Sequence, residues 1–156
     1  APLFAHAEGW QWTPDLIWFN NLEAFTTPNY HVQKLFSTNA GTHLVSVQED
    51  GEEIKGQNGL YATASMDERT GELIVKFVNV SSGEISLNMD IEGTSLSSFG
   101  SLTVLKNSDL GAENSFDVQN IKPEVEEISI DGSTISVAAP AYSMSVLRVK
   151  ESQSVN

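Results

Sequence analysis

Residues 71–79 (GELIVKFVN), followed by residues 85–91 (ISLNMDI), decide the fold class. In both stretches apolar residues recur at every second position, which is the period of a strand with one buried face. In the first stretch both alternating rows are apolar. The buried row is therefore either Leu73, Val75 and Phe77 or the row one residue out of phase.

From residue 43 onward the same alternation returns in six more short runs. These runs are 43–48, 60–66, 101–106, 127–131, 133–138 and 142–150. Asp131-Gly132 supplies the positive φ angles of a tight hairpin turn, and residues 67–71 and 81–83 are predicted hairpin loops with left-handed glycines. At least eight short antiparallel strands without helices predict a β-sandwich of jelly-roll type.

Residues 1–42 differ in composition, because they hold eight of the thirteen aromatic residues and all three tryptophans. Thr27-Pro28 is typical of a helix start and predicts a helix over about 28–39, ended by Asn39 and Gly41 through a left-handed cap. The continuous apolar runs 2–5 and 16–19 are typical of parallel barrel strands buried on both faces. Such a strand at 2–5 is expected to lack partners within this sequence.

Composition and charge restrict the possible partners. Hydrophobic residues make up 40% of the chain and charged residues 19%, as in folded proteins. The net charge of −13 repels phosphates, so neither nucleic acid nor an anionic membrane is an expected partner. There is no cysteine and the three histidines lack metal-ligand spacing, so no metal or other cofactor is expected. The start at Ala1, without Met, suggests a processed or excised fragment.

Six segments together resemble glycoside hydrolase family 51 α-L-arabinofuranosidases. Residues 1–4, 12–21 and 27–37 are similar to the end of that family's catalytic barrel, and residues 61–79, 113–116 and 140–148 to its C-terminal sandwich. The resemblance runs in order along nearly the whole chain. It implies a mainly β chain in which 1–42 is the remnant of a (β/α)8 barrel, 43–150 the sandwich and 151–156 a tail.

The resemblance also implies a parent enzyme that removes terminal α-L-arabinofuranosyl groups from arabinan or arabinoxylan by a retaining mechanism. Such a mechanism needs two carboxyl groups about 5–5.5 Å apart. In the family both are glutamates upstream of the position of Ala1, so the chain alone is expected to be inactive. Its expected partners are the upstream barrel and, through the parent, an arabinose-containing polysaccharide. A secreted or periplasmic location is favoured by analogy alone.

By the same likeness, residues 2–5 are the eighth barrel strand and residues 6–14 the loop after it, where barrel active sites lie. We therefore expect Trp10, Trp12 and Asp15 at or near the sugar pocket. An indole face packs on a sugar ring, and a carboxylate accepts hydroxyl protons. The other aromatic residues of this part are expected in the core: Trp18, Phe19, Phe25 and Tyr30.

Three alternatives remain open. Self-contained catalysis would need a pair among Glu8, Asp15 and Glu23, which sit on different predicted elements. A carbohydrate-binding module would present exposed aromatic rings. The sandwich offers Tyr61, Phe77, Phe99, Phe116 and Tyr142, of which Phe77 and Tyr142 lie in strands, so a domain that braces the barrel is favoured.

The third alternative, a non-catalytic interaction domain, leaves the barrel-like pattern of residues 1–42 unexplained. Apolar surface left exposed in that part predicts attachment to the sandwich through the helix, or a homo-oligomer paired along the orphan strand.

Overall fold

The computed structural model describes residues 3–9 and 15–152. Its main sheet has six antiparallel strands: β4 (His43–Val45), β7 (Leu60–Asp67), β8 (Glu72–Asn79), β10 (Leu96–Lys106), β11 (Glu124–Ser129) and β13 (Ser143–Glu151). Their order across the sheet is β11-β10-β13-β8-β7-β4. The chain is thus mainly β and antiparallel from residue 43 onward, as the alternation predicts.

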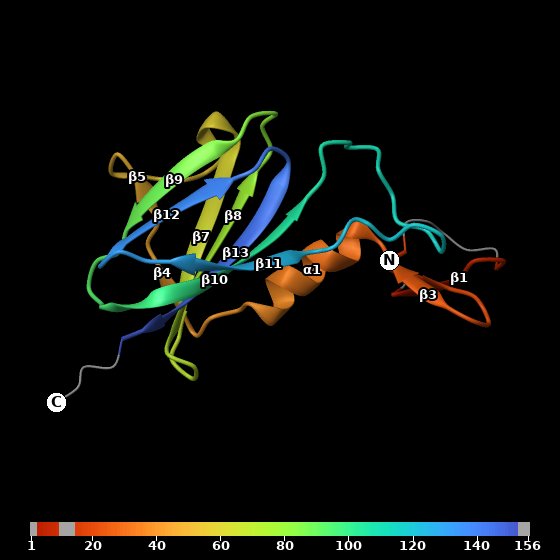
Figure 1. Ribbon diagram of the computed structural model, residues 1–156, viewed down its shortest axis with the longest axis horizontal. Helices are drawn as coiled ribbons and strands as arrows, with labels where there is room; N and C mark the ends of the chain where they lie inside the picture. The colour runs from red at the N-terminus through yellow and green to blue at the C-terminus, as the bar shows by residue number, and fades with distance from the viewer. Residues whose placement is uncertain (1–2, 10–14, 153–156) are drawn as a thin grey trace.

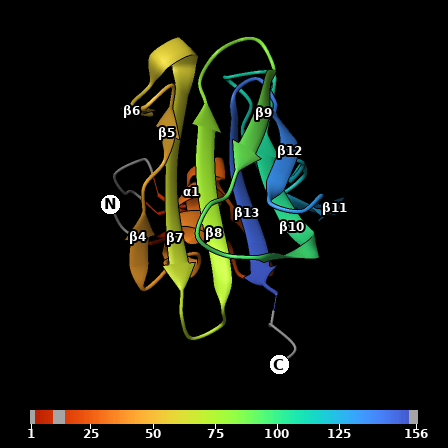
Figure 2. The ribbon, with the colours of Figure 1, turned by 90° about the vertical axis from the view of Figure 1, so that its left-hand side faces the viewer.

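Each face of this sheet is covered by a different layer (Figures 1 and 2). The pair β9 (Ile85–Asp90) and β12 (Thr134–Ala139) lies on one face, and helix α1 (Pro28–Thr38) lies on the other. Smaller elements are the hairpin β5 (Gln48–Glu49) and β6 (Glu52–Glu53) and the 3-10 turn η1 (Gln57–Gly59).

Because both faces of the main sheet are covered, the alternation in β8 could not decide which of its two rows of side chains is buried. Leu73, Val75 and Phe77 are buried between the sheets, where the partly buried apolar residues of β9 pack against them. Ile74, in the opposite row, is also fully buried, because it faces Leu35 of α1. Both apolar rows of β8 therefore contribute to a core.

Of the three predicted hairpin loops, only one joins two strands that pair along their length. Gly71 (φ +64°) does close a β7–β8 hairpin. The turn at Asp131-Gly132 forms, with Gly132 at φ +63°, but β11 and β12 belong to different sheets. The loop 81–83 likewise joins β8 to β9 in the other sheet, and Gly83 is not left-handed. Turn residues specify a bend, whereas the partner of the next strand depends on packing.

Helix α1 ends where predicted but not by the predicted left-handed cap. Asn39 has φ −119°, and its side-chain amide donates to the carbonyl of Leu35 at 2.9 Å. Lys76 Nζ donates to the Asn39 carbonyl and Arg148 donates to Asn39 Oδ1, both at 2.9 Å. Two cations of the main sheet thus meet the negative end of the helix dipole. These bonds fix α1 to the sandwich, as expected.

The N-terminal strands form a separate small sheet in the order β1 (Phe4–His6), β2 (Ile17–Phe19) and β3 (Ala24–Thr26). Strand β1 pairs in parallel with β2, so the expectation that it lacks partners within this sequence is wrong. The second continuous apolar run supplies the partner strand for the first. All four aromatic residues expected in the core here are half-buried: Trp18, Phe19, Phe25 and Tyr30.

Candidate functional site: the loop after β1 and its supports

The candidate site is the loop of residues 7–16, which leaves the carboxyl end of β1 and returns to β2. It starts with a tight turn, because Gly9 N donates to the His6 carbonyl at 3.0 Å and Glu8 N donates to His6 Nδ1 at 3.2 Å. The imidazole of His6 packs edge-on against Phe19, with ring centroids 5.2 Å apart. The first residues of the loop are therefore held against β2.

The three predicted sugar-pocket residues are not brought together by the described part of the chain. Trp10 and Trp12 lie outside the described residues. Asp15 is described and is only 1% exposed. Ile17, two residues later, is level with Phe4 in the β1–β2 register, so Asp15 lies on the amino-terminal side of β1. His6 and the start of the loop lie at the other end.

The return of the loop is fixed to the start of α1. The carbonyl of Leu16 accepts from both the backbone N and the hydroxyl of Thr27, at 3.0 and 3.2 Å. Thr27 is the predicted N-cap, and its hydroxyl accepts from Tyr30 N at 3.2 Å. Asp15 therefore adjoins a residue that is bound directly to the first turn of a helix.

A half-buried histidine lies beside this junction. His31 Nε2 lies 3.0 Å from the Thr26 hydroxyl, at the end of β3. Burial, and then the positive charge of Lys34, lower the pKa of His31 below its ordinary value. At pH 7 the ring is therefore uncharged, and it forms a hydrogen bond with the hydroxyl as a neutral imidazole.

The long connection between β10 and β11 reaches from the sandwich to the small sheet, as Figure 1 shows. Asn114 on it is 6% exposed and donates to the carbonyls of Thr26 and Ile121, each at 2.8 Å. Its Oδ1 accepts from Ile121 N at 3.0 Å. Phe116 packs edge-on against Phe25 with centroids 4.9 Å apart.

Sequence reasoning did not single out Asn114, although it noted segment 113–116 as family-like. A loop asparagine carries no periodic signal, so only its contact across 88 residues reveals its role.

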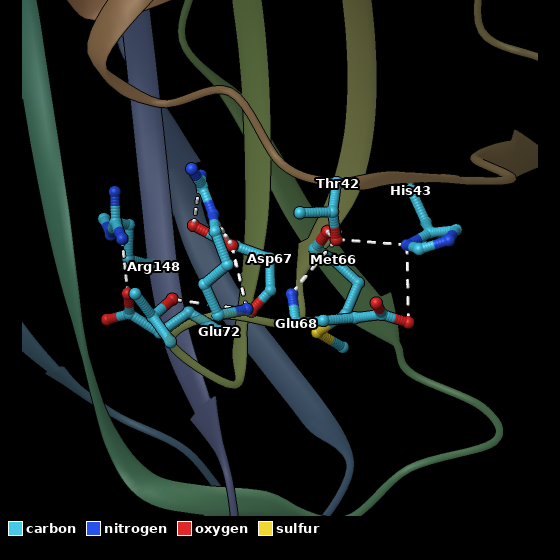
Figure 3. Close-up of polar contacts among 9 residues, drawn as sticks. Thr42, His43, Met66, Asp67, Glu68, Glu72 and Arg148 are labelled. Carbon is cyan, nitrogen blue, oxygen red and sulfur yellow. Dashed lines mark hydrogen bonds and ion pairs between the residues drawn. The ribbon is translucent and has the colours of Figure 1, made fainter.

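A second polar cluster lies at the opposite end of the sandwich, around the β7–β8 hairpin (Figure 3). Arg69 donates twice to Asp67, at 2.8 and 3.0 Å, and Arg148 donates to Glu72. The hydrogen bond from Arg148 lowers the pKa of Glu72, and the hydrogen bond from Arg69 lowers that of Asp67. Each carboxylate is thus paired, which fits a structural role.

The described residues contain no group of three or more side chains that could hold a metal ion. Within the same residues, no helix has the length and apolar character needed to cross a membrane.

Comparison with protein families gives one match that covers most of the chain. The model of the α-L-arabinofuranosidase C-terminal domain matches residues 1–143. Alpha-L-arabinofuranosidase A of Aspergillus niger is 33% identical over 149 residues, which are 94% of this chain and 22% of that protein. Alpha-L-arabinofuranosidase 1 of Arabidopsis thaliana is 29% identical over 152 residues, with 93% and 22% covered. The chain therefore spans about a fifth of the length of these curated relatives.

Solved structures agree with this match. The arabinose-bound α-L-arabinofuranosidase MgGH51 superposes with a TM-score of 0.84 at 29% identity, over 97% of this chain and 24% of that one. The α-L-arabinofuranosidase of Thermotoga maritima, in its arabinose complex, superposes with a TM-score of 0.72 at 19% identity, over 88% and 32%. The second likeness supports the fold alone.

Proposed function

Because the chain belongs to the α-L-arabinofuranosidase C-terminal domain family of glycoside hydrolase family 51, we propose that it is the non-catalytic C-terminal part of a retaining α-L-arabinofuranosidase. The parent enzyme would remove terminal arabinofuranosyl groups from arabinan or arabinoxylan. The relatives are several times longer than this chain. Their additional length leaves room for a catalytic barrel with the two carboxyl groups that retention requires.

One observation carries the proposal: the family match spans residues 1–143, which include the small sheet and most of the sandwich. Asn114 and α1 fasten these two parts together, so a sandwich built this way can brace the end of a barrel. We propose residues 1–42 as the end of that barrel, 43–150 as the sandwich and 151–156 as a tail. Strand β13 extends one residue into the proposed tail, to Glu151.

Within the parent we propose that the loop after β1 contributes Trp10 and Trp12 to the sugar pocket. Support comes from the loop's origin at the carboxyl end of β1, which is the end where barrel active sites form. Asp15 fits direct sugar contact less well, because it is buried and lies toward the amino-terminal side of the same strand.

A carbohydrate-binding module is the second candidate, since Tyr61 and Phe99 are 50% and 60% exposed. The two rings do not share a platform. Across the main sheet, Tyr61 of β7 is level with Met144 of β13 and Leu105 of β10. Leu105 lies six residues beyond Phe99 on β10. At about 3.3 Å per residue, the rings are on the order of 20 Å apart along the strands. A sugar ring could therefore contact only one of them.

The test is an activity assay with an aryl α-L-arabinofuranoside, applied to this chain and to the complete enzyme that carries it. The chain alone should give no turnover above buffer, and the complete enzyme should be active. In the complete enzyme, Trp12→Ala should raise KM, with Tyr61→Ala as the control that leaves KM unchanged. Turnover by the chain alone that is lost in Asp15→Asn would show that catalysis resides here and overturn the proposal.

Retardation in arabinan gels addresses the second candidate. A sandwich that binds polysaccharide would be retarded, and Tyr61→Ala or Phe99→Ala would abolish the effect. We expect no retardation.

A further inference from the structure

An apolar groove beside α1, at one end of the main sheet, has no role in the proposed function as stated above. The groove has a volume of about 510 Å³. Its floor is a row of residues that are level with one another on the face that α1 covers: Val78 of β8, Met144 of β13 and Leu105 of β10. One wall is a single side of α1, formed at intervals of four residues by Pro28, Val32 and Phe36. Helix α1 thus covers only part of this face of the sheet.

Exposed apolar side chains gather around this groove. Phe36 is 43% exposed and Val80, directly after β8, is 52% exposed. Leu110, on the connection from β10 to β11, is 74% exposed and lines the same groove. Single exposed apolar residues are common on protein surfaces, whereas a contiguous group of them marks an interaction site. The groove and these three side chains, called the α1 groove below, therefore have the character of a contact surface.

Three of the polar residues that line the α1 groove are already used within the chain. Asn79 donates to the carbonyl of Ala139 at 2.9 Å, and the hydroxyl of Ser143 donates to the carbonyl of Pro140 at 2.6 Å. Asp109 Oδ1 accepts a backbone N–H at 2.9 Å. A site for a small polar ligand needs polar groups that are free to fix the ligand's orientation. The α1 groove therefore fits an apolar protein surface better than a sugar.

The place of α1 in the proposed barrel indicates what covers this groove. The outer helices of a (β/α)8 barrel stand side by side in a ring, so the last helix has a neighbour on each side. Within residues 3–9 and 15–152, α1 is the only α-helix. The matching family is that of a C-terminal domain and the curated relatives are several times longer, so a neighbouring helix would belong to the upstream part of the parent. A second copy of this chain is disfavoured, because the net charge of −13 opposes self-association.

We propose that the α1 groove receives an amphipathic helix of the catalytic part of the parent enzyme, which lies alongside α1 and packs an apolar stripe against Phe36, Val80 and Leu110. This inference rests on the proposed function. Packed helices lie about 8–10 Å apart, which brings the neighbour of α1 over the groove. The two helices together would then cover this face of the main sheet, and the sandwich would hold the barrel through both of them.

Cysteine labelling tests the proposal, because the chain has no cysteine of its own. Val80→Cys and Leu110→Cys place a thiol at the groove, and Phe99→Cys, at a 60% exposed site six residues from Leu105 on β10, is the matched control. All three thiols should react readily with a maleimide in this chain, with the rate at each site read by peptide mapping. In the complete enzyme the rates at positions 80 and 110 should fall by about tenfold or more, since the core of an interface is packed as densely as a protein interior. The rate at position 99 should not change, and unchanged rates at positions 80 and 110 would overturn the proposal.

Replacing Leu110 with the photoreactive residue benzoylphenylalanine identifies the occupant. In the complete enzyme its cross-links should fall on apolar positions of one upstream helix, spaced three or four residues apart. Cross-links to a loop would overturn the proposal. Protection of positions 80 and 110 in this chain alone would do so as well, by showing a second copy if it rises with concentration, or a sugar site if arabino-oligosaccharides cause it. Failure of the proposed function is distinct, since it would appear as a complete protein without arabinofuranosidase activity.

Discussion

Asn114 is expected to hold the small N-terminal sheet to the sandwich, and its replacement by alanine tests this directly. The side chain makes three hydrogen bonds of 2.8–3.0 Å and is 6% exposed. Each bond contributes about 0.5–1.5 kcal/mol net, and the backbone groups left buried without partners add a further penalty. We therefore expect Asn114→Ala to cost about 2–4 kcal/mol, a large share of a typical stability of 5–15 kcal/mol.

For a chain of this length, a loss of that size corresponds to a fall in Tm of about 4–16 °C. Thermal melts followed by circular dichroism would measure it, and amide exchange should show loss of protection in residues 24–31. Asn88→Ala is the control, because Asn88 is exposed and accepts a single bond, from Ser136. If the two variants melted at the same temperature, the connection between β10 and β11 would not couple the two parts.

Three further predictions concern the core, a close approach and a titrating group. Phe77→Ala should cost about 3–5 kcal/mol in chemical denaturation, because Phe77 is 1% exposed between the sheets, whereas Phe99→Ala at a 60% exposed site should cost little; equal midpoints would contradict the assigned core. Gly41→Ala should lower Tm by several degrees, since a Cβ there would lie 2.5 Å from Ser65 Cβ, and a neutral result would show that α1 can shift away from β7. Burial lowers the pKa of His31 in the folded chain, so as the pH falls the unfolded chain binds a proton at this residue before the folded chain does. Stability should therefore fall as the pH drops below about 6.5. His31→Gln should flatten that part of a Tm-against-pH profile, and an unchanged slope would refute the shift.

The prediction of elements from the sequence succeeded where the signal is local. Period-two alternation located the sandwich strands, and Thr27-Pro28 located the start of α1. The end of the helix depends on long-range contacts that the sequence does not show. Asn39 ends the helix through bonds to Lys76 and Arg148, which lie 37 and 109 residues away.

The candidate site was predictable only in outline. The resemblance located a loop after β1, and the structure confirms that β1 and β2 flank residues 7–16. Asp15 was expected near sugar, but it is buried and lies on the amino-terminal side of β1. Burial of a carboxylate cannot be inferred from a loop sequence, because it depends on which segments cover it.

The sequence by itself determined the fold class, the positions of most strands and the family of this chain. Only the tertiary structure decided which sheet each strand joins, as the turns at 81–83 and Asp131-Gly132 show. It alone revealed that both rows of β8 contribute to a core, since Ile74 meets a helix and Phe77 meets a second sheet. The physical reason is the same in each case. Alternation and turn residues act within a few positions of the chain, whereas pairing and burial depend on contacts between segments far apart in sequence.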